Sequence, residues 1–404
     1  MIRSFDDFFN ETVTVNIRFI EPYDGGSHRA FRLGLSASSR HDIRSETLPA
    51  RFWKWRMRGS AVLFADALNE DADRPDLLFC TDFLNVADFR GLLRPPLDRC
   101  PVVLYMHENQ LTYPLSPRET FDFHFGFTNI VSCMAADAVV FNSDFHRDLF
   151  LDGLPGYLGR MPEAVPPRVR ERLEGKMSVL PVGIDRGPRP ADAPWGDGAP
   201  YLGGPCAADA GPDWPRAEAA PTILWNHRWE FDKRPEWLVE ALTTLHGEGL
   251  DFRLHLLGET RQRDDVFAPL RELLGPKVLS FGHVPGRDAY DRILETSDIV
   301  VSCAAQEYFG ISVAEAVQAG CYPVLPREQV YPSLYGTKCR GNHFYDGADG
   351  LADLLRSLVS GRDGGHVCSL PLDCDAFRWE RLAPRFDDLF DELLDKAGDH
   401  VPNL

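Results

Sequence analysis

Four charged residues in the second half of the chain have the types and spacing of a nucleotide-sugar site. Arg228 and Lys233 lie five residues apart, directly after an apolar strand-like run, and Glu307 and Glu315 lie eight residues apart. Two cations at the end of a strand can neutralise a diphosphate leaving group as its charge develops. Two carboxylates can accept hydrogen bonds from sugar and ribose hydroxyls. The alternative is a surface salt-bridge cluster, and either pair alone would favour neither reading.

The segment between the two glutamates strengthens this interpretation. Phe309 and Gly310 precede a helix-compatible stretch. A glycine lets the backbone approach a phosphate closely, and a helix N-terminus favours anions. Glu315 lies five residues after Gly310, or about 7.5 Å along a helix, which is about the span from a diphosphate to its ribose hydroxyls. We therefore predict Glu315 as a ribose ligand and Glu307 as a ligand of the sugar.

The first half of the chain carries two further polar segments at predicted strand ends. Asp24-Gly25-Gly26-Ser27-His28 follows the first strand, and its glycines predict a tight turn and a possible nest for an anion. His107-Glu108-Asn109-Gln110 follows a later strand. We expect His107 to contact the transferred sugar, and Ser27, His28, Asn109 and Gln110 to lie on the acceptor side. The alternative readings are an ordinary turn and a histidine satisfied within the fold.

The most basic stretch runs from residue 51 to 58, with the sequence Arg-Phe-Trp-Lys-Trp-Arg-Met-Arg. Cations suit phosphates, and aromatic rings stack on unpaired bases. Arg51, Lys54 and Arg58 are predicted to share one helical face, with Trp55 beside them, which makes this stretch a candidate RNA contact. The alternative is a cationic amphipathic helix packed against an acidic protein.

Predicted strands alternate with helical patterns in both halves of the chain, which indicates parallel sheets built from βαβ units. Residues 187–221 break the alternation with many prolines and glycines. We therefore predict a Rossmann-like domain at 1–186, a linker or insertion at 187–221 and a second Rossmann-like domain at 222–376. An amphipathic helix is predicted within 377–404. Ligands of such sheets bind at the carboxyl ends of the strands, so we expect a cleft between two αβα domains.

Composition excludes several classes of protein. The chain has 404 residues, and its formal net charge of −18 opposes wide, non-specific binding to polyanions. No apolar run is long enough to span a bilayer, and the N-terminus does not resemble a secretory signal. The nine cysteines form no Cys-x-x-Cys pair. These features predict a soluble, cytoplasmic protein with no membrane attachment.

Several motifs resemble the tRNA-queuosine mannosyltransferase family. They cover about residues 15–345 apart from the linker, and the most specific are His-Glu-Asn-Gln at 107–110 and Trp-Asn-His-Arg-Trp-Glu at 225–230. The others begin at Glu21, Leu48, Glu307, Glu315 and Val330. The paired glutamates belong to a wider group of retaining glycosyltransferases.

The resemblance implies a GT-B fold of two facing Rossmann-like domains, with the last helix crossing back to the N-terminal domain. It implies mannose transfer from GDP-mannose to the cyclopentenediol of queuosine in tRNA, with no essential metal or other cofactor and no obligate protein partner. In this group Arg228 and Lys233 would hold the diphosphate, Glu307 the sugar and Glu315 the ribose, so the expected donor residues are Gly25, Gly26, Arg228, Lys233, Glu307, Phe309, Gly310 and Glu315.

Two alternatives remain open at this point. One is a GT-B transferase that uses another nucleotide sugar and a small-molecule, glycan or lipid acceptor. The other is a nucleotide-sugar or RNA-binding module without turnover. The residues alone fix neither the sugar nor the base of the nucleotide.

Overall fold

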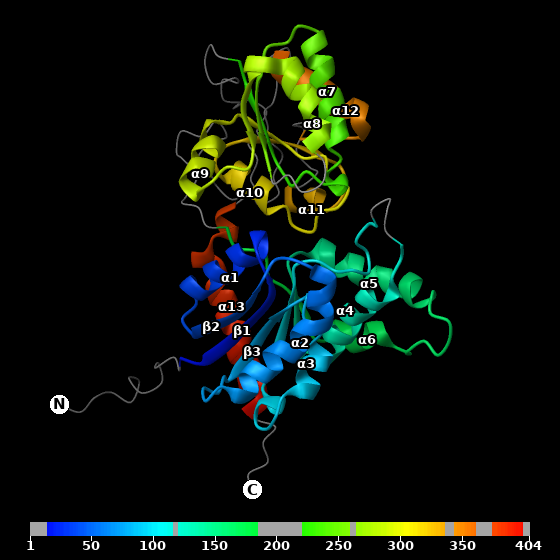
Figure 1. Cartoon of the computed structure of the whole chain (residues 1–404), viewed down its shortest axis with the longest axis vertical. Coiled ribbons are helices and arrows are strands. Elements are labelled where there is room, and N and C mark those ends of the chain that lie inside the picture. Colours follow the sequence, from blue (N-terminus) through cyan, green and yellow to red (C-terminus); the bar gives the residue numbers. More distant parts are fainter. Residues whose placement is uncertain are drawn as a thin grey trace, which may run out of the picture. The chain divides into compact units, whose positions relative to one another are not determined.

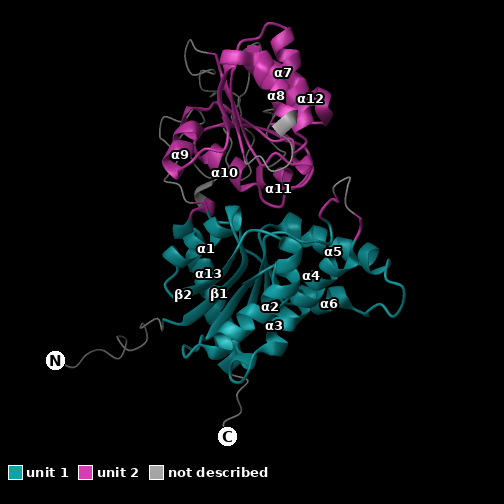
Figure 2. Ribbon diagram, in the orientation of Figure 1, with its two compact units in different colours: residues 1–112, 122–183, 379–404 teal, residues 113–121, 184–378 magenta. Residues whose placement is uncertain are grey.

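The computed structural model describes residues 14–115, 120–184, 220–258, 264–335, 343–360 and 374–398. The chain divides into two compact units, which Figure 2 shows in different colours. Among the described residues, the first unit holds those up to 112, 122–183 and 379–398. The second holds residues 113–121 and 184–378. The predicted linker at 187–221 lies outside the described residues, except for its last two positions.

The first unit is built on a six-stranded sheet whose pairings are all parallel, in the order β2-β1-β3-β4-β5-β6. Its strands are β1 Asn16–Asp24, β2 Asp42–Pro49, β3 Leu77–Thr81, β4 Val102–Met106, β5 Ala138–Phe141 and β6 Met177–Val179. Its helices are α1 Gly26–Ser38, α2 Trp53–Glu70, α3 Val86–Leu92, α4 Phe123–Ala135, α5 Asp144–Leu158, α6 Val169–Glu174 and α13 Trp379–Gly398. Figure 1 labels these helices and the strands β1, β2 and β3. Strands β3, β4 and β5 are buried throughout, as expected when helices cover both faces of a parallel sheet.

The last helix, α13, is fixed to the start of the chain by close packing. A β-carbon at Gly34 or at Gly183 would overlap the indole of Trp379, so only glycine fits at these two positions. The carboxylate of Asp387 accepts hydrogen bonds from the Ser39 hydroxyl and from the Arg40 backbone. Helix α13 therefore packs its predicted apolar face against the rest of the first unit.

The second unit has a six-stranded parallel sheet in the order β12-β11-β10-β7-β8-β9. Its strands are β7 Thr222–Asn226, β8 Arg253–Leu257, β9 Val278–Gly282, β10 Ile299–Val301, β11 Tyr322–Pro326 and β12 Phe344–Tyr345. Its helices are α7 Pro235–Gly247, α8 Asp264–Leu274, α9 Arg287–Thr296, α10 Ile311–Gln318, α11 Tyr331–Tyr335 and α12 Gly347–Ser360. Short 3-10 turns, also part of this unit, lie at Phe231–Lys233, Gly275–Lys277 and Cys374–Phe377.

Strand order places a switch point in each sheet, where ligands of doubly wound folds bind. In the second sheet, chain order reverses between β7 and β10, the two strands that precede Lys233 and Glu307. In the first sheet it reverses between β1 and β3, the strands that precede His28 and Asp82. The predicted residues Lys233, Glu307 and His28 therefore follow strands that border a switch point of their own sheet.

Some elements differ from the sequence-based prediction. Strand β2, strand β12 and helix α5 are not predicted by the apolar patterns. Helix α2 begins at Trp53, so Arg51 precedes it and does not share a helical face with Lys54 and Arg58, contrary to the prediction. In the described part of the chain, no helix is both long enough and apolar enough to span a membrane.

Candidate active site

Lys233 is the charged centre of the candidate donor site in the second unit. The 3-10 turn that follows β7 buries its side chain to 8% exposure. Its ammonium group donates to the Gln306 carbonyl at 2.7 Å and lies 3.2 Å from the carboxylates of Glu307 and Asp232. Burial alone would lower the pKa of Lys233, but the two carboxylates raise it above its usual value. The lysine is therefore a fixed, buried cation.

Glu307 connects this cation to the start of α10. One carboxylate oxygen lies 3.2 Å from the Lys233 ammonium, and the other accepts a hydrogen bond from the Gly310 backbone at 3.0 Å. Burial raises the pKa of Glu307, but the charge of Lys233 outweighs it, so the net pKa is lowered. The predicted cation and carboxylate thus form an ion pair, and the carboxylate is charged.

The turn before α10 favours glycine at position 310. Its φ is +80°, and a β-carbon there would lie 3.2 Å from the Tyr331 ring and 3.3 Å from the Glu307 side chain. Phe309, which precedes it, is buried and packs edge-on against Phe377, with ring centroids 5.1 Å apart. Phe309 therefore anchors the turn inside the fold, and Gly310 sets its direction.

Glu315 lies on α10 and is 8% exposed. Arg287 donates to one of its oxygens at 2.7 Å, and the Tyr290 hydroxyl donates to the other at 3.3 Å. The Asn226 amide in turn bonds the Tyr290 hydroxyl and the Ser312 carbonyl, which links the end of β7 to α9 and α10. These contacts hold a charged, doubly hydrogen-bonded carboxylate in place beside the strand end.

Arg228 is the exposed member of the predicted set. Its side chain is 50% exposed and lies 3.4 Å from Glu230. Its charge is still close enough to oppose that of Lys233, because it is among the causes that lower the lysine's pKa. The structure therefore brings Lys233, Glu307, Gly310 and Glu315 together in one unit, with Arg228 at the solvent-exposed side.

A second polar cluster lies beside the switch point of the first sheet. His28, near the start of α1, pairs with Glu21 of β1 at 3.2 Å, and its ring lies 4.0 Å from that of His107. Burial would lower the pKa of His28, but Glu21 and other acidic neighbours raise it to about 9. Burial, with the charge of His28, holds the pKa of His107 well below its usual value. The cluster therefore combines a protonated histidine with a neutral one.

The neutral His107 is held from its backbone. Its N–H donates to Asp82 at 3.1 Å, and Nε2 is buried with no hydrogen-bond partner. Burial raises the pKa of Asp82 above its usual value despite the nearby His28 charge. The orphaned Nε2 is a buried polar atom able to bind a hydroxyl or a metal ion.

The glycine loop starts α1 rather than forming a closed phosphate cradle. Gly25 is the N-cap residue, and a β-carbon there would lie 2.4 Å from that of Ala50. Gly26 has a φ of +52°, with open space where a side chain would be, and Ser27 is exposed. Gly25 thus allows close packing next to β2, whereas Gly26 and Ser27 remain accessible.

Asn109 and Gln110 shape the loop after β4. Asn109 is fully buried, and its Oδ1 accepts from the backbone of Leu111 and Thr112 and from the Thr112 hydroxyl. Gln110 is partly exposed and donates to Glu108 at 2.8 Å. Within this loop, Asn109 fixes the backbone and Gln110 is the side chain that remains accessible to a ligand.

The basic stretch is accessible to solvent. Arg51, Lys54 and Arg58 are exposed, and the Trp55 ring is 61% exposed. Arg56 instead is buried and donates to the Pro49 carbonyl, which ties the start of α2 to the end of β2. Burial and the charge of Arg51 lower the pKa of Arg56. The predicted acceptor-side residues of this stretch therefore lie at the surface.

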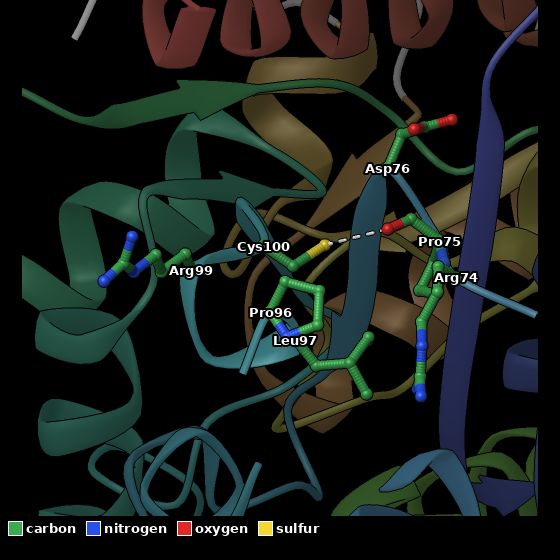
Figure 3. Close-up of a pocket in the computed structure, with 7 residues that line it drawn as sticks. All are labelled: Arg74, Pro75, Asp76, Pro96, Leu97, Arg99 and Cys100. Atoms are coloured by element: carbon green, nitrogen blue, oxygen red, sulfur yellow. Dashed lines mark hydrogen bonds between the residues drawn. The ribbon is translucent and has the colours of Figure 1, made fainter. Parts of the chain in front are cut away.

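Three residues in the described part of the chain have the geometry of metal ligands. Glu21, His28 and His107 each offer an atom within 4.8 Å of the others. Figure 3 shows a separate pocket of about 180 Å³ at the amino ends of β3 and β4, lined by Arg74, Pro75, Asp76, Pro96, Leu97, Arg99 and Cys100. It is smaller than the usual ligand pocket of ~300–1,000 Å³, and none of the predicted site residues lines it.

Several functional partners are missed from the sequence alone. The predicted residues are held in place by Asp232, Arg287, Tyr290, Asp82 and Glu21, none of which was predicted as a site residue. Glu21 had a usable signal, because it is a carboxylate directly after the apolar pair Phe19-Ile20 and begins one of the family motifs. Arg287 had none, since its role depends on contact between α9 and α10.

Comparison with solved structures identifies the fold. A sucrose-phosphate synthase from Thermosynechococcus elongatus matches with a TM-score of 0.63 and 14% identity, over 94% of this chain and 100% of that one. A protein from Anabaena, solved in complex with UDP and glucose, matches with a TM-score of 0.59 and 14% identity, over 95% and 100% of the two chains. With its two parallel-sheet α/β units, this chain has the GT-B fold, as predicted.

Comparison of sequences identifies the family. Residues 16–184 match the model of the N-terminal domain of tRNA-queuosine alpha-mannosyltransferase, and residues 211–369 match glycosyl transferases group 1. A curated relative from Drosophila melanogaster, named tRNA-queuosine alpha-mannosyltransferase, is 34% identical over 395 residues, which is 93% of this chain and 97% of the relative. These matches confirm the predicted enzyme class over the binding-module alternative. The chain is a glycosyltransferase and belongs to the tRNA-queuosine alpha-mannosyltransferase family.

Proposed function

We propose that this enzyme transfers mannose from GDP-mannose to the cyclopentenediol of queuosine in tRNA, with retention of the anomeric configuration. The observation that carries the donor assignment is the buried Lys233–Glu307 pair at the start of α10. The acceptor assignment is supported by the family and by the name of the Drosophila relative. We place the reaction in the cytoplasm, where tRNA is available.

Donor binding exchanges the partners of Lys233. Its ammonium has three N–H donors, and Gln306, Glu307 and Asp232 already surround it. A diphosphate oxygen that binds the lysine therefore displaces one carboxylate. If the displaced group is Glu307, its oxygen becomes available to a hydroxyl of the sugar, so diphosphate binding and sugar binding are coupled.

The remaining donor contacts follow from the placement of the side chains. Arg228 supports the diphosphate from the exposed side, and the free N–H groups at the start of α10 add positive potential. Glu315, already charged and held by Arg287, accepts hydrogen bonds from the ribose hydroxyls. His107, neutral and with an unpartnered Nε2, bonds a hydroxyl of the mannose. Gly25 and Gly26 let the backbone approach the donor at the start of α1.

The chemical step needs no nucleophile from the protein. An acceptor hydroxyl attacks the anomeric carbon on the face from which GDP leaves. The new carbon–oxygen bond forms as the bond to the phosphate oxygen breaks, and the hydroxyl proton passes to that phosphate oxygen. Lys233 and Arg228 stabilise the charge that develops on GDP. The residues proposed for the acceptor side are Ser27, His28, Asn109, Gln110, Arg51, Lys54 and Trp55, with Asn109 acting through the loop backbone that it holds. No metal ion takes part.

The test pairs binding with product analysis. Thermal-shift measurements with a panel of nucleotide sugars should give the largest stabilisation with GDP-mannose. Incubation of that donor with queuosine-containing tRNA, followed by mass spectrometry of the nucleosides, should show queuosine bearing one hexose, and none on tRNA that lacks queuosine. An α-linkage by NMR supports retention. Preference for another donor, or transfer only to a lipid or free sugar, would refute the proposal.

A further inference from the structure

Phe52, the residue before α2, combines an unfavourable backbone conformation with a solvent-exposed aromatic ring. Phe52 is the N-cap residue of α2 and has left-handed dihedral angles, φ 55° and ψ 51°. A residue with a β-carbon rarely adopts this conformation. The side chain of Phe52 is nevertheless 73% exposed. Packing inside the protein therefore does not explain why an aromatic residue occupies this position.

A second aromatic ring is displayed one turn later. The Trp55 indole is 61% exposed and lies along the surface of α2 over Gly59. A β-carbon at Gly59 would lie 2.7 Å from Cζ2 of Trp55, so a larger residue would push the indole away. A glycine inside a helix costs stability relative to alanine. Gly59 therefore lowers the stability of α2 but leaves room for the exposed Trp55 indole to lie along the helix surface.

The start of α4 adds a third ring. Trp53 of α2 and Phe125 of α4 pack with ring centroids 5.0 Å apart, so the two helix starts are neighbours. Phe123, two residues before Phe125, is 43% exposed and stacks on His124 with centroids 4.1 Å apart. The exposed aromatic rings therefore come from two adjacent elements of one unit.

The cations among these rings favour an anionic partner. Arg51 and Arg58 are exposed, and in the parts of the chain that the structure describes neither forms an ion pair within 4.0 Å. The charge of Arg58 is among the causes that lower the pKa of Asp122. The Arg58 guanidinium lies 5.4 Å above the Phe125 ring. The chain as a whole has a net charge of −18, so two exposed arginines outside any close ion pair contrast with the rest of the protein.

We propose that Phe52, Trp55 and Phe123, with Arg51 and Arg58, form an aromatic platform that stacks unpaired bases of an RNA loop while the arginines contact its phosphates. The inference rests on the proposed function and adds how the enzyme recognises its acceptor. Stacking accepts any base, so the platform recognises a single-stranded loop rather than a sequence. Helix α2 also exposes Val62 and Leu63, which could form an apolar contact with a second copy of this chain. Such a contact would give Arg51 and Arg58 no phosphate groups to bind, so RNA is the better partner.

The test measures RNA binding without any sugar donor. The variants are Trp55→Ala and Phe52→Gly, since glycine tolerates the left-handed conformation. Leu273→Ala, which removes an exposed apolar side chain in the second unit, is the matched control. The probe is a labelled anticodon stem–loop, compared with an RNA of the same length whose loop is replaced by paired bases. Unchanged thermal midpoints show that the variants are folded.

We expect each aromatic variant to weaken stem–loop binding about tenfold, with little change for the paired RNA and an unchanged dependence on salt. Arg58→Ala should instead reduce the salt slope by about one. Unaltered stem–loop affinity of Trp55→Ala, or equal losses for both RNAs, would overturn the platform. So would light scattering that shows a wild-type dimer converted to a monomer by Trp55→Ala without loss of RNA binding.

Different results would refute the aromatic platform and the proposed reaction. A wild-type enzyme that binds the stem–loop through these rings but never forms hexosylated queuosine would refute the reaction and keep the platform. Transfer to queuosine tRNA that is unaffected by Trp55→Ala and Phe52→Gly would keep the reaction and remove the platform.

Discussion

Removing Lys233 from the Lys233–Glu307 pair should cost more stability than removing the charge of Glu307. At 3.2 Å and an effective dielectric constant of about 20, the Coulomb attraction of the pair is about 5 kcal/mol. In Glu307→Gln the lysine keeps Asp232 and the Gln306 carbonyl, and glutamine can still accept from Gly310. We therefore expect that variant to lose only about 1–3 kcal/mol of unfolding free energy.

Lys233→Met should cost more, because it leaves two carboxylates without their cation. Asp232 is 1% exposed and Glu307 is 19% exposed, so both charges remain largely buried after the lysine is removed. We expect a loss of about 3–5 kcal/mol. The double variant should lose about 1–2 kcal/mol less than the sum of the single variants, since the two residues are in contact.

The assay combines stability with kinetics on the full-length enzyme. Calorimetry on all four members of the cycle gives the coupling energy, and mannose transfer gives kcat/KM. The Glu307→Gln variant should lose at least about 100-fold in kcat/KM, and the double variant should be no more active than either single variant. Additive stability losses, or near-normal turnover of Glu307→Gln, would refute the assignment of this pair as the centre of the donor site.

Three further predictions concern other parts of the site. Arg287→Ala should raise the KM for GDP-mannose by about tenfold with a smaller effect on kcat, because Glu315 loses the partner that orients it; an Arg271→Ala control should change neither, and a pure kcat effect would contradict the ribose role. The thermal midpoint of the wild-type enzyme should decrease as the pH rises from 6.5 to 9. The folded-state pKa of His28 is about 9, so the stability that its charge contributes is complete below pH 6.5 and is lost as the pH rises through 9. The contribution is about 3 kcal/mol, and a His28→Gln variant should flatten the decline; an equal decline in both proteins would exclude His28 as its source. Transfer should survive exhaustive chelation; loss of activity that returns with one divalent cation would indicate a metal site, with Glu21, His28 and His107 as its first candidate ligands.

Much of the fold follows from the apolar periodicity of the sequence. Buried parallel strands such as β4 are continuous apolar runs, and α13 presents a regular apolar face, so both are predicted within a few residues. Strand β2 escapes prediction because it is an edge strand with alternating exposure and a polar sequence. Helix α5 escapes because a proline and two glycines interrupt its pattern.

The sequence names the residues of the candidate donor site but not the contacts between them. Sequence spacing points to Lys233, Glu307 and Glu315, because each follows a strand or lies on the helix after one. It does not reveal that Lys233 and Glu307 neutralise each other, or that Arg287 holds Glu315. Those contacts depend on strand order, which brings β7 next to β10, and no local pattern encodes that adjacency.

The most direct test of the donor site is a crystal structure with GDP and with a non-reactive analogue of GDP-mannose. We predict the diphosphate at Lys233 and the start of α10, the ribose hydroxyls within hydrogen-bond distance of Glu315, and Glu307 turned from the lysine to the sugar. A nucleotide bound elsewhere, or bound with the Lys233–Glu307 contact intact and Glu315 untouched, would contradict this prediction.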